Sequence, residues 1–93
     1  MEWTVEDSII AANAMKGLGP ARINKLIKSG DIVRFISGHS DVNNLYSNMQ
    51  LQRQTAREVN AQFVPASSEY YPAALQHLEH PPPLLHAIGD LNL

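Results

Sequence analysis

The stretch of sequence that decides the fold is a glycine-rich turn followed by a basic segment, Lys16-Gly17-Leu18-Gly19-Pro20-Ala21-Arg22-Ile23-Asn24-Lys25-Leu26. Two glycines allow backbone conformations with positive φ, and a proline at the first position of a helix loses no hydrogen bond. The stretch therefore predicts a break between two helices. The second of these helices is expected to span Pro20–Ser29 and to stop at Gly30, a residue that readily adopts the left-handed conformation.

Outward from this turn the sequence predicts two more helices. The first begins after Thr4, whose hydroxyl can cap the free amides of the first turn, and runs to about Met15. Asp31 is expected to cap a short helix over Ile32–Ser37, which ends at Gly38. The buried side chains expected on and beside the first helix are Trp3, Val5, Ile9, Ile10, Ala12 and Ala14.

The middle of the chain is predicted to contain a loop and then one longer helix. Residues 38–48 are rich in Ser, Asn, Asp and Gly, which indicates a loop with one helical turn near Leu45. Residues 49–63 are predicted to be helical, because apolar residues recur there at spacings of three, four and seven.

From residue 64 onward prolines exclude a long helix. Residues 73–78 leave room for one or two turns, and Leu84–Ile88 is a strand candidate followed by a Gly-Asp turn signal. A lone strand is not stable, so it either folds back onto the helices, pairs with a second chain, or belongs to a sheet outside this chain. The predicted fold is mainly α: a small helical bundle over residues 1–63, then a Pro-rich extended tail over 64–93 with one short C-terminal β-strand.

Composition limits the classes of function that the chain can have. Its 93 residues include no cysteine, which excludes disulfide frameworks, thiolate zinc sites and thiol catalysis. No basic, apolar leader and no long apolar run is present, so we expect a cytoplasmic protein without a membrane segment. The net charge of −2 conceals an uneven distribution, since five of the seven basic residues fall in residues 16–34, which carry a net charge of +4. A polyanionic partner is therefore possible despite the overall charge.

The turn itself is the candidate binding site. Its spacing fits the helix-hairpin-helix pattern G-h-G-x-x-x-A-x-x-h, where h is apolar, with Ile23 where alanine is usual. A tight glycine turn brings backbone amides to the surface, and the start of the next helix adds free N–H groups and partial positive charge, which suit a phosphate oxygen. A purely structural turn between antiparallel helices is the competing interpretation. The predicted phosphate-binding residues are Lys16, Gly17, Leu18, Gly19, Arg22 and Lys25.

Other chemistry is weakly represented. No acid–base pair and no nucleophile with a helper residue is recognisable, so the chain is not expected to be an enzyme, and no catalytic residue, metal site or cofactor is assigned. Tyr70 and Tyr71 are candidates for stacking on nucleic-acid bases, but the low aromatic content makes a place in the core the simpler expectation.

Three motifs in the tail resemble those of one protein family. They are Tyr71-Pro72-Ala73-Ala74-Leu75, Pro81-Pro82-Pro83-Leu84-Leu85 and Gly89-Asp90-Leu91-Asn92-Leu93. Together they are similar to the Y-P-x-x-L, P-P-x-L and G-D-L-x-L run of the bacterial DNA-processing protein A family (DprA, also called Smf). The turn at residues 17–22 is also similar to the G-h-G-P-x-R hairpin near the amino terminus of that family.

The resemblance implies a helical amino-terminal domain of SAM-like or helix-hairpin-helix type, followed by a Rossmann-like domain that this chain does not include. It implies non-specific binding of single-stranded DNA, protection of DNA in natural transformation and loading of a RecA-type recombinase, with no enzymatic activity. The expected partners are therefore DNA, the recombinase and the Rossmann-like domain of the same gene product. The alternative is a SAM-like protein–protein interaction domain, used for dimerisation or docking, that does not contact DNA.

Overall fold

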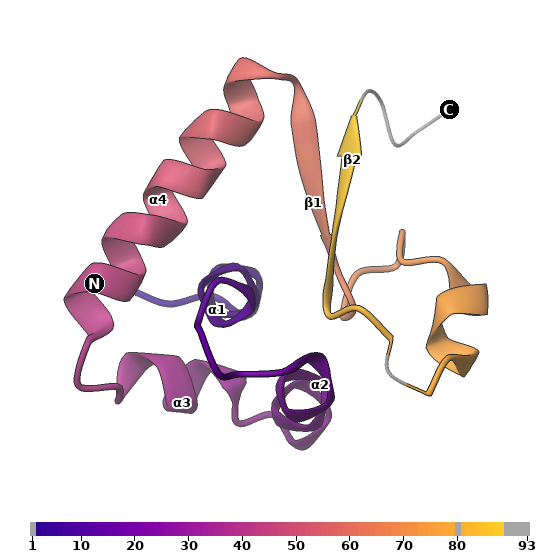
Figure 1. Ribbon diagram of the computed structural model, residues 1–93, viewed down its shortest axis with the longest axis horizontal. Helices are drawn as coiled ribbons and strands as arrows, with labels where there is room; N and C mark the ends of the chain where they lie inside the picture. The colour runs from indigo at the N-terminus through magenta and orange to yellow at the C-terminus, as the bar shows by residue number, and fades with distance from the viewer. Residues whose placement is uncertain (1, 80, 89–93) are drawn as a thin grey trace.

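The computed structural model describes residues 2–79 and 81–88, which form four α-helices and a two-stranded antiparallel sheet (Figure 1). Helices α2 and α3, the five-residue strand β2 and the positions of the caps Thr4 and Gly30 agree with the sequence predictions. In chain order the elements are α1 (Val5–Asn13), α2 (Pro20–Ser29), α3 (Ile32–Ser37), α4 (Val42–Glu58), β1 (Ala61–Pro65), the 3-10 helix η1 (Ala73–His77) and β2 (Leu84–Ile88).

Helix α1 is the centre of the molecule, because α2, α3, α4 and both strands contact it (Figure 1). Because neighbouring elements contact α1 on several sides, its middle residues, 8–12, are all buried and do not form a single buried stripe. Ala11 is therefore fully buried together with Ile9 and Ile10. The predictions that Val5 and Ala14 are buried were wrong: Val5, the first residue of α1, is 45% exposed, and Ala14, its C-cap, is exposed as well.

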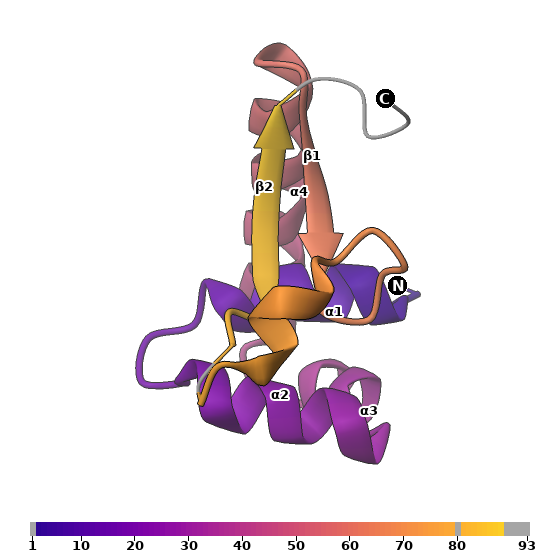
Figure 2. The ribbon, with the colours of Figure 1, turned by 90° about the vertical axis from the view of Figure 1, so that its right-hand side faces the viewer.

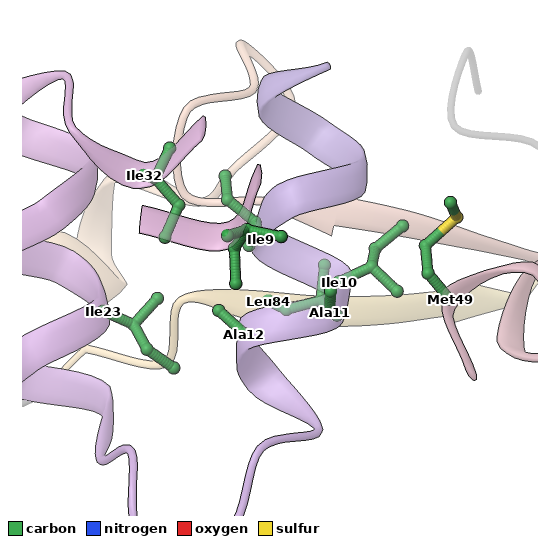
Figure 3. Packing of buried hydrophobic residues seen from close by; sticks show 9 residues of the cluster. Ile9, Ile10, Ala11, Ala12, Ile23, Ile32, Met49 and Leu84 are labelled. Carbon is green, nitrogen blue, oxygen red and sulfur yellow. The ribbon is translucent and has the colours of Figure 1, made fainter. Parts of the chain in front are cut away.

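The hydrophobic core gathers apolar side chains from all four helices and from β2 (Figure 3). Its buried members are Ile9, Ile10, Ala11, Ala12, Ile23, Ile32, Ile36, Met49 and Leu84. One polar side chain lies among them, since Ser8 is fully buried in α1. Its hydroxyl donates to the carbonyl oxygen of Thr4 at 2.8 Å, which satisfies the group locally.

Helix α4 differs from the sequence prediction at both ends. It begins at Val42 instead of residue 49, so most of the predicted loop over residues 38–48 is helical. Leu45 packs against the core, while the amide of Asn44 donates to Asp41 at 2.7 Å and exposed polar residues cover the outer side. The helix ends at Glu58 instead of 63, because Asn60 adopts a positive φ of 54° and turns the chain into β1.

The strand at the end of the chain pairs within the chain. β2 runs antiparallel to β1, with Ala61 opposite Ile88 and Pro65 opposite Leu84. The mainly helical fold and the predicted strand at Leu84–Ile88 are confirmed, but the partner strand β1 was missed, because residues 61–63 were assigned to a helix. The predicted domain boundary at residues 63/64 falls inside β1, and Leu84 of β2 belongs to the same core as the helices.

The connection between the two strands is the Pro-rich segment, in which two turns precede η1 (Figure 2). These turns are closed by hydrogen bonds from Ser68 N to the oxygen of Pro65 at 2.8 Å and from Tyr71 N to the oxygen of Ser68 at 3.2 Å. The predicted one or two turns at residues 73–78 are confirmed. Among the helices of the described residues, none has both the length and the apolar character needed to cross a membrane.

Candidate nucleic-acid interface

The turn between α1 and α2 requires glycine at one position. Gly17 has a φ of +82°, in the left-handed region that L-residues with a side chain rarely adopt, whereas Gly19 has an ordinary φ of −80°. A Cβ atom added at either glycine would meet no atom within 4 Å. The turn is therefore open to its surroundings on both sides.

The start of α2 presents free backbone donors. Gly19 is the N-cap and offers no side-chain acceptor, Pro20 has no N–H, and the first helical bond runs from Ile23 N to the oxygen of Gly19 at 3.1 Å. The N–H groups of Ala21 and Arg22 therefore have no acceptor within the helix. No acidic residue occupies the first turn of α2, so nothing there neutralises the positive end of the helix dipole.

Five of the six predicted phosphate-binding residues are exposed. These are Lys16, Gly17, Gly19, Arg22 and Lys25. The sixth, Leu18, is half-buried and packs against the core. Its side chain holds the turn against the bundle and leaves only its backbone for contact with a ligand.

Two of the cations lie next to the connection between α3 and α4. The Arg22 guanidinium lies over the ring of Phe35, 5.6 Å from its centroid, a distance typical of a cation–π contact. Phe35 in turn contacts His39, with ring centroids 6.3 Å apart, and His39 lines a shallow hollow together with Lys16 and Asp41. Lys16 and Arg22 thus flank one patch of surface, with Asp41 as the acidic residue at its edge.

Arg53 is a cation that the sequence did not distinguish from the others. Its Nε donates to Asp7 Oδ1 at 2.8 Å, and a second nitrogen contacts both Asp7 and Glu6, which joins α4 to α1. Burial opposes the charge of Arg53, but the hydrogen bonds with the two carboxylates outweigh burial and raise its pKa. The charge of Arg53 is therefore paired with two carboxylates of α1 and is not available to bind a phosphate.

Sequence reasoning also missed two side chains that hold the Pro-rich segment. Asn24 Nδ2 donates to the carbonyl oxygen of Pro81 at 2.6 Å, and the Tyr71 hydroxyl donates to the carbonyl oxygen of Pro82. Tyr71 is only 5% exposed, as the core interpretation predicted, and burial raises the pKa of its hydroxyl. Tyr70 is half-exposed. No local signal pointed to these contacts, because their partners lie 11 and 57 positions apart in the chain.

Comparison of the chain with protein-family models, with curated proteins and with solved structures found no significant match. The resemblance to the DNA-processing protein A family therefore rests on the sequence motifs alone. Of these, the tail motif at residues 89–93 lies outside the described residues.

Proposed function

We propose that this chain is the amino-terminal region of a DprA-like DNA-processing protein and that it contacts single-stranded DNA through the turn at residues 16–25. The observation that carries the proposal is the open start of α2. There the N–H groups of Ala21 and Arg22 have no acceptor within the helix, no acidic residue occupies the first turn, and the exposed cations Lys16, Arg22 and Lys25 are close to them in the sequence.

The chemistry of this surface suits phosphates and not bases. Free helix-terminal amides and flexible cations bind phosphate oxygens whatever the sequence of the strand. Binding should therefore be non-specific and should weaken steeply with salt, because each neutralised phosphate releases counterions. In this proposal the chain is not an enzyme. It supports strand binding by the Rossmann-like domain of the same cytoplasmic gene product, and the loading of a RecA-type recombinase.

The structure also connects two of the motifs that carry the family resemblance. Tyr71, which begins the Y-P-x-x-L motif, donates its hydroxyl hydrogen bond to Pro82 of the P-P-x-L motif. Leu84, the leucine of the second motif, lies in the core with α1. The two motifs thus act together as one packed unit, which supports their interpretation as a single signature.

Fluorescence anisotropy with a labelled single-stranded oligonucleotide tests the proposal. About three phosphate contacts predict roughly 20-fold weaker binding at 200 mM than at 50 mM salt. Replacing both Lys16 and Arg22 by Glu should abolish most of the binding and flatten the salt dependence.

The control separates local contact from net charge. Arg57 is exposed near the end of α4, away from the turn, and Arg57→Glu should weaken binding far less than Lys16→Glu or Arg22→Glu alone. Absence of binding at 50 mM salt, or equal losses for all three single variants, would contradict a site at the turn.

A second candidate function is supported by a different surface. A shallow apolar hollow lies between the carboxyl half of α4 and the sheet, and Leu51 and Val59 beside it are 61% and 57% exposed. Exposed apolar side chains grouped in this way are typical of interaction surfaces. A SAM-like domain that dimerises through this face should give a dimer mass by light scattering. The variant Leu51→Lys should then be monomeric, and a monomer mass for the wild type at high concentration would exclude dimerisation.

A further inference from the structure

A hollow of about 270 Å³ lies between α2 and the segment that carries η1, which lie next to each other in Figure 2. Its lining combines apolar side chains with side chains that carry hydrogen-bonding groups: Ile27, Ala66 and Pro81, with Asn24, Lys28, Tyr71 and Gln76. We propose that this hollow, named here the α2–η1 cleft, accepts one nucleobase of the strand whose phosphates contact the turn. The inference rests on the proposed function and adds to it a site that touches a base.

The polar groups of the cleft match the edge of a base. Asn24 uses its Nδ2 to hold Pro81, which leaves its Oδ1 as a free acceptor. The Gln76 amide forms no hydrogen bond with the described residues and offers both a donor and an acceptor. A base displays donors and acceptors on its edge and apolar flat faces, and the faces suit the side chains of Ile27 and Ala66.

The size and rigidity of the cleft also favour a base. Sites for drug-sized ligands run from about 300 to 1,000 Å³, so a hollow just below this range suits a single flat ring system. Its walls are held in place by the hydrogen bonds from Asn24 and Tyr71 to consecutive prolines. A cleft that is already ordered costs little conformational entropy when it binds.

The position of the cleft places it on the path of a strand bound at the turn. Arg22, Lys25 and Lys28 are exposed along α2 at intervals of three residues, and Lys28 lines the cleft. At a rise of about 1.5 Å per residue, Arg22 and Lys28 lie about 9 Å apart along the helix axis. A strand that follows these cations from the turn, winding about a third of a turn around α2, therefore reaches the cleft with a neighbouring base.

The test compares an oligothymidylate with an abasic strand of the same length and backbone charge, by anisotropy at about 50 mM salt. The wild type should bind the base-containing strand about fivefold more tightly, the factor that corresponds to one net hydrogen bond of about 1 kcal/mol to the edge of the base. Gln76→Ala removes the free amide, and Ala66→Leu fills the cleft. Both variants should lose this preference while keeping the wild-type affinity for the abasic strand. The control Gln54→Ala, at an exposed glutamine of α4, should behave as the wild type.

The possible outcomes separate this inference from the proposed function. Equal affinity of the wild type for the two strands would contradict base binding in the α2–η1 cleft but would not contradict phosphate contact at the turn. If Gln76→Ala and folded Ala66→Leu both keep the preference for the base-containing strand, the base does not bind in the α2–η1 cleft. If Ala66→Leu does not fold, Gln76→Ala decides, because Gln76 is exposed and its truncation leaves the core unchanged. No binding of either strand would overturn both proposals.

Discussion

Asn24 of α2 donates a hydrogen bond of 2.6 Å to the carbonyl oxygen of Pro81, 57 positions further along the chain. This bond fastens the Pro-rich segment to the helix that follows the glycine turn. The candidate phosphate site and the tail motifs are therefore parts of one structural unit. Asn24 is 9% exposed, so water has little access to replace the bond if it is lost.

Replacing Asn24 by Ala should lower the free energy of unfolding by about 1–3 kcal/mol, because the carbonyl oxygen of Pro81 loses its donor in a partly buried place. Urea denaturation followed by the fluorescence of Trp3, the single tryptophan, measures the loss. The control is Asn43→Ala, at an exposed asparagine of α4, which should leave stability unchanged or slightly raised. Equal effects of the two substitutions would show that the bond to Pro81 contributes nothing.

Gly17 and Gly19 should respond differently to a side chain. Gly17→Ala places a Cβ in the left-handed region and should cost about 1–2 kcal/mol, although the space around it is open. Gly19→Ser places a preferred capping residue at the N-cap of α2, where the backbone is extended, and should be neutral or slightly stabilising. Thermal melts of the two variants measure this contrast, and a loss at Gly19→Ser as large as at Gly17→Ala would contradict it.

Arg53 and Asp7 should be energetically coupled. A double-mutant cycle with Arg53→Gln and Asp7→Asn should give a coupling energy of about 0.5–1 kcal/mol, since the pair is only partly screened by solvent. The coupling should shrink as salt is added. The same cycle with Arg57→Gln, one turn further along α4 and exposed, should give a value near zero. A salt-independent coupling, or one of equal size for Arg57, would contradict a specific ion pair.

The hydroxyl of Tyr71 should make stability depend on pH at the alkaline end. Burial raises its pKa in the folded protein above the ordinary value of 10.0, so the folded state holds the proton more tightly than the unfolded state. Its contribution is fully present below about pH 10 and is lost as the pH rises through the folded pKa.

Stability of the wild type should therefore fall as the pH rises from about 10 through the raised pKa of the folded protein. Urea midpoints across this pH range measure the fall. Tyr71→Phe should be less stable below pH 9, because it lacks the bond to Pro82, and its alkaline fall should be shallower. Parallel pH profiles for the two proteins would contradict the raised pKa.

The elements that the sequence predicted correctly are those with strong local signals. Pro20 and Gly30 bound α2, and Thr4 accepts the hydrogen bond of Asp7 N at 3.0 Å. Each signal acts through the φ angle or the backbone donors of its own neighbours, so it operates whatever the rest of the chain does. The exposure of Arg22 and Lys25 has another cause, since charged side chains on the surface of a helix remain in water.

The features that only the tertiary structure decided depend on residues far apart in the sequence. β1 exists because β2 pairs with it, and residues 61–63 by themselves have a pattern that also fits a helix. The early start of α4 depends on Leu45 and Met49 packing on α1, which outweighs the low helix propensity of the asparagines. The α2–η1 cleft depends on the bond from Asn24 to Pro81. The sequence by itself thus determined the turn, its charge and the local helix limits, whereas pairing and burial across the chain decided the sheet, the core and the cleft.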